Sequence, residues 1–447
     1  MAKFEYVIKR NGAKVPFTPG RITNAIYRAA VAVGGRDKST AEDLTLKVIS
    51  YLENTLPKKR IPSVEEIQDA VEKMLIENGH ARVAKAYILY RDERARLRQQ
   101  RDAISFRPSE NIPWAKIWQV LDWAVTHNLY SVEILNQRIA DGEIGDIISE
   151  AEMFYEEDIK IASEMIFQRK QDIRVVLITG PSSSGKTTTT IKLGQRLQQK
   201  DLRLVTLNVD NYFFDLDDHP RDEFGDYDFE APQALDLALI NDHLKKLIQG
   251  KEVQLPFYDF KTGKRTDDYT AMKIGKNEII LIDSLHGMYP AMTEEIPAEQ
   301  KFKLYLEPLL QMKDLEGNYI RWTDIRLMRR MLRDAAFRAY DPEMTLTHWH
   351  YVRASEMRNI VPNVNQADHV ISSAMPYELS IYQPKLIHLF QKWVEKYKKD
   401  ALRQDAYERA ARVLKLLKTI TPITDDSVVP GDSVIREFIG GSTLKYH

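Results

Sequence analysis

The chain has 447 residues, of which 43% are hydrophobic, and it contains no cysteine. This length exceeds one ordinary hydrophobic core and predicts two or three domains, while the lack of thiols excludes disulfides, thiol-radical chemistry and cysteine-based metal sites. Lys and Arg total 64 against 65 Asp and Glu, and the resulting net charge of −1 provides no global field for nucleic acid or an anionic membrane.

The first residues, MAKFEYVIKRNG, carry charges where a signal peptide needs an apolar core, and no run of about 18 apolar residues follows. We therefore expect a cytoplasmic protein with neither a membrane nor a nucleic-acid partner.

Residues 1–100 predict a small mixed α+β domain. Strand-like residues Phe4 to Ile8 and Val15 to Phe17 flank a turn, and a helical repeat of apolar residues follows from position 22. Ser63 and Glu66 have the spacing of a capping box at the start of another helix. A last helix runs out into the charged residues 91–101.

This segment resembles the ATP-cone, a nucleotide-sensing module of ribonucleotide reductases and of their repressor. The similar stretches are Val7 to Gly12, Arg21 to Ile26, and Gly79 to Arg91. Arg21 stands where the family usually has Lys, and both side chains could meet a phosphate. The resemblance implies an adenine nucleotide effector bound through Lys9, Arg10, Asn11, Gly12 and Arg21. The alternative is a small domain with ordinary surface cations.

Residues 101–172 predict a helical connector that carries no recognisable chemistry. Trp114, Trp118 and Trp123 are expected to face a core rather than a ligand. A long amphipathic helix is expected from Ser149 to Arg169.

A phosphate-binding loop follows the connector. The apolar run Arg174 to Thr179 predicts a buried parallel strand, and Gly180 to Thr187 then matches G-x-x-x-x-G-K-[ST] before a helix. These elements predict the doubly wound parallel α/β sheet of P-loop NTPases, and Lys186 and Thr187 are expected to meet ATP phosphates and Mg²⁺. The residues expected around the nucleotide are Gly180, Ser182, Ser183, Ser184, Gly185, Lys186, Thr187 and Thr188.

Two carboxylates end further apolar strands. Asp210 follows Leu204 to Val209, and Asp283 follows Asn277 to Ile282. Substrates bind beyond the carboxyl ends of strands in such sheets, so Asp210 could accept a proton from an attacking hydroxyl. Asp283 has the pattern of a Mg²⁺ ligand. Taken alone, Asp210 could equally cap the next turn.

An arginine stripe is expected on one helix face, because Arg326, Arg329, Arg330 and Arg333 are spaced i, i+3, i+4 and i+7. Met328, Met331 and Leu332 occupy the other side of the predicted helix. Clustered guanidinium groups repel each other unless an anion joins them, which favours a lid over a transferring phosphoryl group. The alternative is a solvated basic face paired with acids.

Together these residues resemble the uridine kinase and phosphoribulokinase family from about Arg174 to Phe390, through the P-loop, Asp210, the arginine stripe and the segments Pro256 to Phe260, Asp283 to Gly287 and Ala367 to Val370. The resemblance implies Asp210 as general base, Lys186 as phosphate clamp, and Thr187 with Asp283 on the metal. It further implies a lid of Arg326, Arg329 and Arg330, and substrate contacts from Asp228, Glu230, Tyr258 and Arg326.

Two positions depart from the family pattern. Asp283 replaces the usual Glu, and Gly263 stands where pyrimidine-reading members carry a His. The second departure puts uridine specificity in doubt. Further stretches, including residues 435–442 of the tail, resemble a longer bacterial uridine-kinase-like subgroup.

The resulting hypothesis is an ATP- and Mg²⁺-dependent kinase with a hydroxyl acceptor. A nucleoside acceptor is favoured, the alternative being a sugar, sugar phosphate or polyol, and a non-catalytic ATP sensor is a further alternative. A reductase or its repressor would need cysteines, and no Asn-Lys-x-Asp guanine motif supports a GTPase.

The expected domains are residues 1–100, the connector 101–172, the kinase domain 173–395 and a C-terminal extension 396–447 that packs on the kinase domain. We also expect nucleotide regulation through the first domain, because two nucleotide sites on one chain permit coupling. A homo-oligomer is a further expectation.

Overall fold

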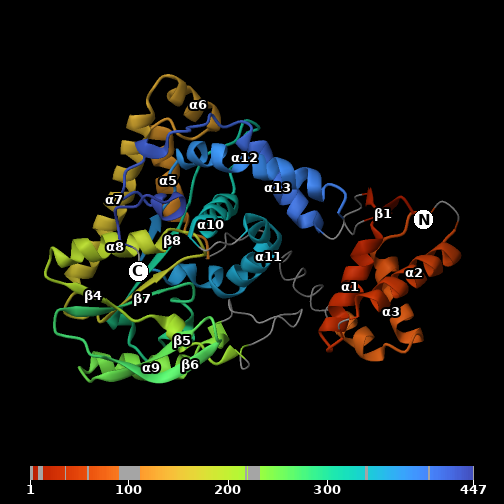
Figure 1. Ribbon diagram of the computed structural model, residues 1–447, viewed down its shortest axis with the longest axis horizontal. Helices are drawn as coiled ribbons and strands as arrows, with labels where there is room; N and C mark the ends of the chain where they lie inside the picture. The colour runs from red at the N-terminus through yellow and green to blue at the C-terminus, as the bar shows by residue number, and fades with distance from the viewer. Residues whose placement is uncertain are drawn as a thin grey trace. The chain divides into compact units, whose positions relative to one another are not determined.

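The structure is a computed structural model that describes residues 4–8, 14–35, 37–57, 60–89, 111–216, 219, 232–337, 341–400 and 403–445. The chain divides into two compact units (Figure 1). The first comprises Met1–Pro108, Pro220–Asp228 and Lys399–Gln404, and the second comprises Ser109–His219, Phe229–Lys398 and Asp405–His447. Each unit is described by itself.

The first unit pairs a small hairpin with a helical core. Strands β1 (Tyr6–Ile8) and β2 (Lys14–Pro16) are antiparallel. Helices α1 (Pro19–Val31), α2 (Lys38–Thr55) and α3 (Val64–Glu77), with helical residues 81–89, enclose a core that includes Ile26, Val48 and Leu75. The predicted capping box is confirmed, since Ser63 Oγ accepts from the Glu66 N–H at 3.2 Å and the Ser63 N–H donates to Glu66 at 2.9 Å.

A parallel sheet organises the second unit. Its strand order is β4 (Arg203–Thr206), β7 (Glu278–Ser284), β3 (Val175–Thr179), β8 (Lys301–Glu307) and β9 (His369–Ser372). All neighbours are parallel, so their carboxyl ends meet at one edge. The strand predicted before the P-loop is central and fully buried. The expected α/β P-loop fold is therefore confirmed.

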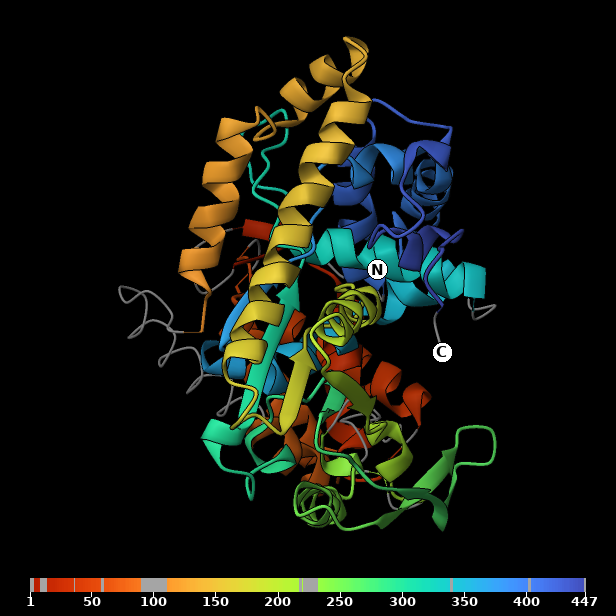
Figure 2. The ribbon, with the colours of Figure 1, turned by 90° about the vertical axis from the view of Figure 1, so that its left-hand side faces the viewer.

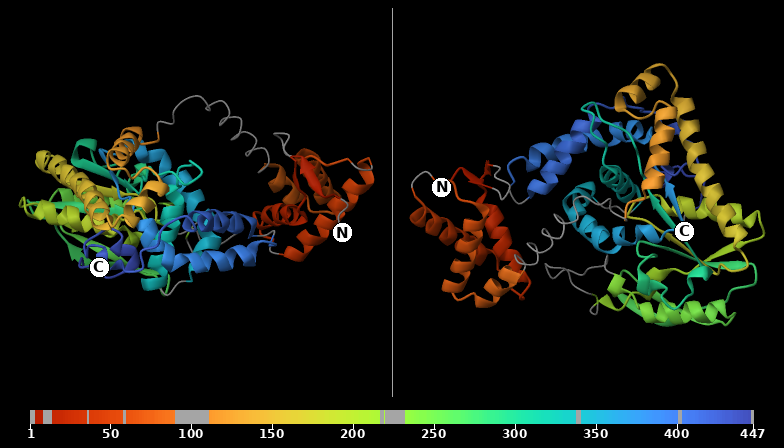
Figure 3. Two further views of the ribbon diagram at one scale, coloured as in Figure 1. Left: turned by 90° about the horizontal axis from the view of Figure 1, so that it is seen from above. Right: turned by 180° about the vertical axis from the view of Figure 1, so that it is seen from behind.

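Helices cover both faces of this sheet, as a doubly wound fold requires. On one face, Val176 and Ile178 pack in a core shared with α7 (Ile144–Gln168) and α8 (Lys186–Gln198), and Figure 2 shows the length of α7. On the other face, Val175 and Leu177 pack with α9 (Leu237–Ile248). The antiparallel hairpin of β5 (Val253–Asp259) and β6 (Lys264–Met272) lies beside α9 (Figure 3).

The remaining helices extend the first of these two cores. They are α5 (Trp114–Thr126), α6 (Val132–Ala140), α10 (Trp322–Phe337), α11 (Pro342–Asn359), α12 (Glu378–Tyr397), α13 (Gln404–Leu417) and α14 (Arg436–Ile439). Residues of the connector and of the C-terminal extension thus share one hydrophobic cluster with the sheet. The boundaries drawn at residues 100, 172 and 395 stay predictions. Within the described ranges, no helix is both long and apolar enough to cross a membrane.

The expectation for the connector tryptophans is wrong for two of the three. Trp114 and Trp118 are 52% and 67% exposed, whereas Trp123 packs against the core and stacks on Phe154. The reason is that Val120 and Ala124 form the buried stripe of α5, and residues 114 and 118 lie on the opposite side of the helix.

Candidate active site

The P-loop lies between the end of β3 and the start of α8. Ser183 and Gly185 have positive φ angles of 60° and 92°, which turn the chain so that the first N–H groups of α8 face the loop. A Cβ at Gly180 would overlap the carbonyl oxygen of Leu306, so only glycine fits against β8. Lys186 Nζ donates to the Gly180 carbonyl at 3.0 Å and therefore folds across the loop.

Several loop oxygens are buried and point to a polar occupant. Ser183 Oγ and Ser184 Oγ have no hydrogen-bond partner among the residues that the structure describes. Buried hydroxyl groups without partners are costly, and a polyphosphate would satisfy them. Thr187 is the second residue of α8 and is partly buried. Ser182 Oγ accepts a hydrogen bond from Arg330, and Thr188 Oγ1 donates one to Glu437.

Asp283 lies beside the P-loop strand, because β7 pairs with β3 in the register Ile178 to Asp283. Burial raises the pKa of Asp283 to about 6; the charge of Lys186 lowers it, while Glu437 and Asp210 raise it further. These four charged groups therefore share one electrostatic neighbourhood. Apart from Thr190 Oγ1 at 3.4 Å, no hydrogen bond to this carboxylate is found among the described residues.

Asp210 lies in a short 3₁₀ turn, Val209–Tyr212, directly after β4. Its backbone N–H donates to the side chain of Asn208 at 3.0 Å, so Asn208 caps this turn. The Asp210 residue is exposed at the carboxyl edge of the sheet. Because β4 pairs with β7, Asp210 follows the strand next to the one that carries Asp283.

The arginine stripe is not one free cationic face, which corrects the expectation for two of its members. Arg326 is fully buried, pairs with Glu356 at 2.5 Å and donates to the Ser182 carbonyl at 3.1 Å. Arg329 is also fully buried and forms a bidentate pair with Glu378 at 2.7 and 3.0 Å. Both guanidinium groups are neutralised by acids distant in sequence.

The other two arginines of the stripe, Arg330 and Arg333, are partly exposed. Arg330 keeps 22% of its side chain exposed and donates to Ser182 Oγ of the P-loop at 3.2 Å. Arg333 lowers the pKa of Lys186 through its charge, although burial is the larger cause of that shift. Both also pair with Asp334. Of the predicted lid residues, Arg330 has the contact and the exposure that a phosphate ligand needs.

A third carboxylate, not among the predicted site residues, lies at the same edge of the sheet. Glu307 ends β8, accepts from Tyr305 at 2.8 Å and lies 3.6 Å from Arg326. Burial raises the pKa of Glu307, while the charge of Arg326 opposes the shift. The signal that singled out Asp210 and Asp283, an apolar strand ending in an acid, is also present in the run up to Glu307.

The expected acceptor region is formed by the β5–β6 hairpin. Tyr258 is buried among Phe213 and Phe260, and its hydroxyl has no hydrogen-bond partner within the described part of the chain. Gly263 has a φ of 67°, and a Cβ there would lie 2.8 Å from the Cβ of Leu216. The hairpin backbone therefore selects glycine at this position over any larger side chain.

Several predicted residues lie outside the described residues. These are Asp228 and Glu230 of the substrate site and Lys9, Arg10, Asn11 and Gly12 of the effector site. Arg21 is described and is exposed in the first turn of α1.

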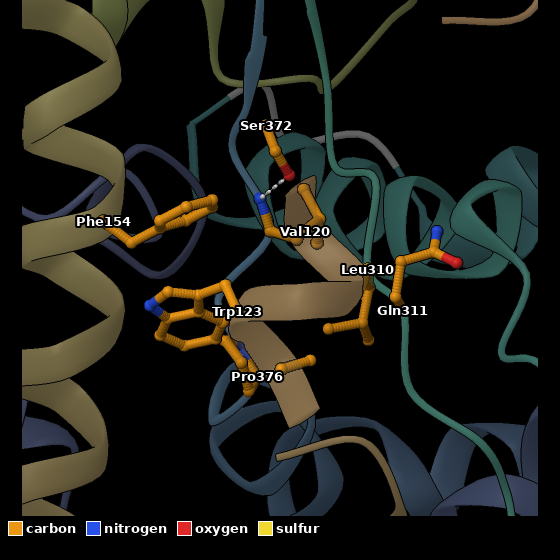
Figure 4. Close-up of a pocket in the computed structure, with 9 residues that line it drawn as sticks. Val120, Trp123, Phe154, Leu310, Gln311, Ser372 and Pro376 are labelled. Atoms are coloured by element: carbon orange, nitrogen blue, oxygen red, sulfur yellow. Dashed lines mark hydrogen bonds between the residues drawn. The ribbon is translucent and has the colours of Figure 1, made fainter. Parts of the chain in front are cut away.

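A separate small pocket lies where α5 meets the ends of β8 and β9 (Figure 4). Trp123 and Phe154 form one wall, and Leu310 and Pro376 contribute to the rest. The lining is mostly apolar and contains no charged side chain. Its position beside Ser372 shows how closely the connector packs on the strand ends.

A P-loop on a central parallel strand, with the charge of Asp283 at the end of the adjoining strand acting on the P-loop lysine, is the arrangement of an ATP-dependent kinase with a P-loop fold. Comparison with known proteins agrees with this class. Residues 175–379 match the Phosphoribulokinase / Uridine kinase family, and residues 5–96 match the ATP cone domain.

Individual relatives include a kinase and a reductase. A uridine kinase of Borrelia turicatae is 28% identical over 211 residues, which are 47% of this chain and 91% of that enzyme. A vitamin B12-dependent ribonucleoside-diphosphate reductase of Thermoplasma acidophilum is 40% identical over 106 residues, which are 23% of this chain and 13% of that enzyme. A solved structure titled a possible uridine kinase from Bacillus stearothermophilus aligns at 16% identity and a TM-score of 0.30, over 47% of this chain and 98% of that one.

The chain thus joins a segment that matches the ATP cone domain to a segment that matches the Phosphoribulokinase / Uridine kinase family.

Proposed function

We propose that the kinase domain transfers the γ-phosphoryl group of ATP to the hydroxyl of a small molecule, with Asp210 as general base. The observation that carries the proposal is the grouping of Asp210, Asp283 and Lys186 at one end of the sheet, beside the P-loop. The acceptor oxygen forms a bond to the γ-phosphorus while its proton passes to Asp210, and the bond to the β–γ bridging oxygen breaks to release ADP.

The residues present fit a magnesium ion. Mg²⁺ prefers oxygen ligands, and Asp283 supplies a carboxylate that lacks a close cationic hydrogen-bond donor among the described residues. Thr187 Oγ1 is the hydroxyl that the P-loop motif assigns to the metal. When bound, the ion would neutralise phosphate charge, while Lys186 and Arg330 hold the phosphate oxygens.

Arg326 and Arg329 take a different part in this proposal from Arg330. Their ion pairs with Glu356 and Glu378 fix α10, and Arg326 also holds the Ser182 carbonyl. They act as positioning residues that keep the P-loop and the side chain of Arg330 in place relative to each other. Arg326 as a direct substrate ligand would first have to leave Glu356.

A nucleoside is the favoured acceptor, because the matched relatives of the kinase domain include uridine kinases. The hairpin favours the alternative, a sugar, sugar phosphate or polyol. Gly263 offers no side chain to a pyrimidine edge, and Leu216 fills the adjoining space. Tyr258, with a buried hydroxyl, is proposed to meet an acceptor hydroxyl, and Asp228 and Glu230 are proposed to do the same.

The ATP cone is proposed to bind an adenine nucleotide through Lys9 to Gly12 and Arg21 and to alter kinase activity or assembly. A second nucleotide site that favours one state of the enzyme would couple to the first by a few kcal/mol at most. A homo-oligomer in the cytoplasm is the setting that we propose for this regulation.

A coupled ADP-release assay with nucleosides, sugars, sugar phosphates and polyols tests the proposed reaction. We expect ADP formation to require one acceptor class, and Asp210→Asn to lower kcat by about 10²–10⁴-fold with little change in ATP affinity. Asp201→Asn is the matched control, since Asp201 is exposed at the opposite end of β4. ADP released without any acceptor, or full turnover by Asp210→Asn, would contradict the proposal.

A further inference from the structure

The C-terminal segment, residues 429–439, is built into the kinase core. Val434, Ile435 and Phe438 are fully buried. Arg436 donates to the carbonyl oxygens of Val429 at 2.6 Å and Asp426 at 2.8 Å, which closes the segment on itself. Buried aliphatic and aromatic anchors of this kind hold a segment in one place.

This segment lies along the beginning of α8. Lys192 on α8 has 4% of its side chain exposed, contacts Glu156 and pairs with Asp432 at 2.7 Å. Nearer the P-loop, a Cβ on Gly185 would lie 2.5 Å from Val434 Cγ2. The segment therefore reaches from the second turn of α8 to its N-terminal cap.

Glu437 is the member of the segment that contacts the nucleotide-binding end of α8. Its Oε2 atom accepts from the Thr188 N–H at 3.1 Å and from Thr188 Oγ1 at 2.9 Å. Glu437 is 8% exposed and Thr188 is fully buried. Burial lowers the pKa of Lys186 and raises that of Asp283, and the charge of Glu437 opposes the first shift and adds to the second, so the carboxylate lies close to the catalytic groups.

The same donors serve the nucleotide in a P-loop. Backbone N–H groups at the start of the helix cradle the α- and β-phosphates, and the helix dipole favours an anion there. A carboxylate and a phosphate are both acceptors, so one N–H cannot bind both at full strength. A carboxylate near Asp283 would in addition repel the incoming polyphosphate.

We propose that Glu437 is an internal competitor of the nucleotide: its carboxylate occupies the two Thr188 donors that the ATP phosphates require, and ATP binds when the Glu437 side chain leaves them. The inference rests on the proposed function, because it assumes that the P-loop binds ATP. The measured affinity for ATP is then the intrinsic affinity reduced by the fraction of molecules in which Glu437 is displaced. The segment itself need not move.

Substitution of Glu437 in the full-length chain tests this competition. Glu437→Gln keeps the shape of the side chain and removes its charge. We expect the Kd of Mg-ATP, measured by calorimetry, to fall by about tenfold. This is the change expected if Glu437 occupies the Thr188 donors in about ten molecules for each one in which they are free. The Kd of adenosine should stay unchanged, because adenosine has no phosphate to compete. Glu395→Gln, at an exposed position on α12, makes the same charge change as the control.

The opposite results would overturn the inference. An unchanged or weaker affinity of Glu437→Gln for ATP would mean that Glu437 only caps α8 or itself contacts the nucleotide. If this variant does not fold, Glu437→Asp provides the test. Its side chain is one methylene shorter, so its carboxylate should no longer reach the Thr188 donors, and the Kd of Mg-ATP should again fall. Folded wild type and variants that all fail to bind ATP would refute the proposed function, and the inference with it.

Discussion

Arg329 and Arg330 are adjacent in the chain, yet their surroundings give them different roles. Arg329 Nη2 donates to the Ser373 carbonyl at 2.7 Å, and the whole guanidinium is shielded from water by the pair with Glu378 and by the ring of Phe438. Arg330 extends toward Ser182 and keeps contact with solvent. A buried, fully paired guanidinium is expected to support the fold, and a partly exposed one is free to meet a ligand.

Alanine substitutions should separate the two roles. Arg329→Ala leaves Glu378 buried without its partner, and we expect a loss of about 3–5 kcal/mol in the free energy of unfolding in urea. Arg330→Ala should change that free energy by less than about 1 kcal/mol and should lower kcat for ADP release by at least roughly tenfold. Equal destabilisation by both variants, or full activity of Arg330→Ala, would contradict this assignment.

At the scale of elements, C-terminal helices complete the core that carries the P-loop. Val413 and Leu417 of α13 belong to the same hydrophobic cluster as Val176 of β3 and Leu346 of α11. Polar contacts fix the order of these helices. Arg412 on α13 forms a bidentate pair with Asp324 on α10, with both distances 2.7 Å. This ion pair joins α13 to α10, the helix that carries the four arginines of the stripe.

Asp405 makes the packing of α11 and α13 sensitive to pH. It lies 3.3 Å from both His350 and Arg409; partial burial opposes the shift, but these two partners lower its pKa from 3.8 to about 2. A pKa below the ordinary value means that the ionised form stabilises the fold above pH about 4, and that this stability is lost as the pH falls toward 2. Because 46% of the side chain is exposed, the contribution is at most about 1 kcal/mol.

Thermal unfolding at several pH values checks this contact. We expect Asp405→Asn to lower the Tm at pH 5 and to lower it by less at pH 3.5, where the wild-type carboxylate begins to lose its advantage. Asp172→Asn, at an exposed turn position, serves as the control. A difference in Tm that grew between pH 5 and pH 3.5 would contradict the assigned direction of the pKa shift.

At the scale of the whole molecule, two compact units each have their own hydrophobic core. The core of the first unit includes Ile22 and Leu52, and none of its members belongs to the cluster around the sheet. Separate cores allow each unit to fold by itself. A unit that folds separately can be removed without disturbing the core of the other.

Removal of residues 1–100 tests the regulatory proposal. We expect the shortened chain to keep phosphoryl transfer, since the P-loop, Asp210 and Asp283 all lie in the second unit, and to lose the response of activity or assembly to added adenine nucleotides. Steady-state assays and light scattering with ATP, ADP and dATP provide the measurements. Arg21→Ala in the full chain should weaken the same response. Identical nucleotide response and identical mass of the two chains would refute the regulatory role.

The sequence by itself determined the features that depend on neighbours in the chain. The P-loop motif, the apolar strand before Gly180, the capping box at Ser63 and the acids that follow strands are local patterns, because backbone turns, caps and strand ends are specified within a few residues. The resemblance to two families followed from the same local signals, and the matches at residues 5–96 and 175–379 agree with it.

The tertiary structure alone decided which charges are paired. Glu356, Glu378 and Glu437 meet Arg326, Arg329 and Thr188 across 30, 49 and 249 positions of the sequence, and no local pattern encodes such contacts. Helical spacing placed the arginines on one face but could not tell which of them would be desolvated. That outcome depends on what packs against the helix, and it separates the two fully buried, paired arginines from Arg330, which we propose meets a phosphate.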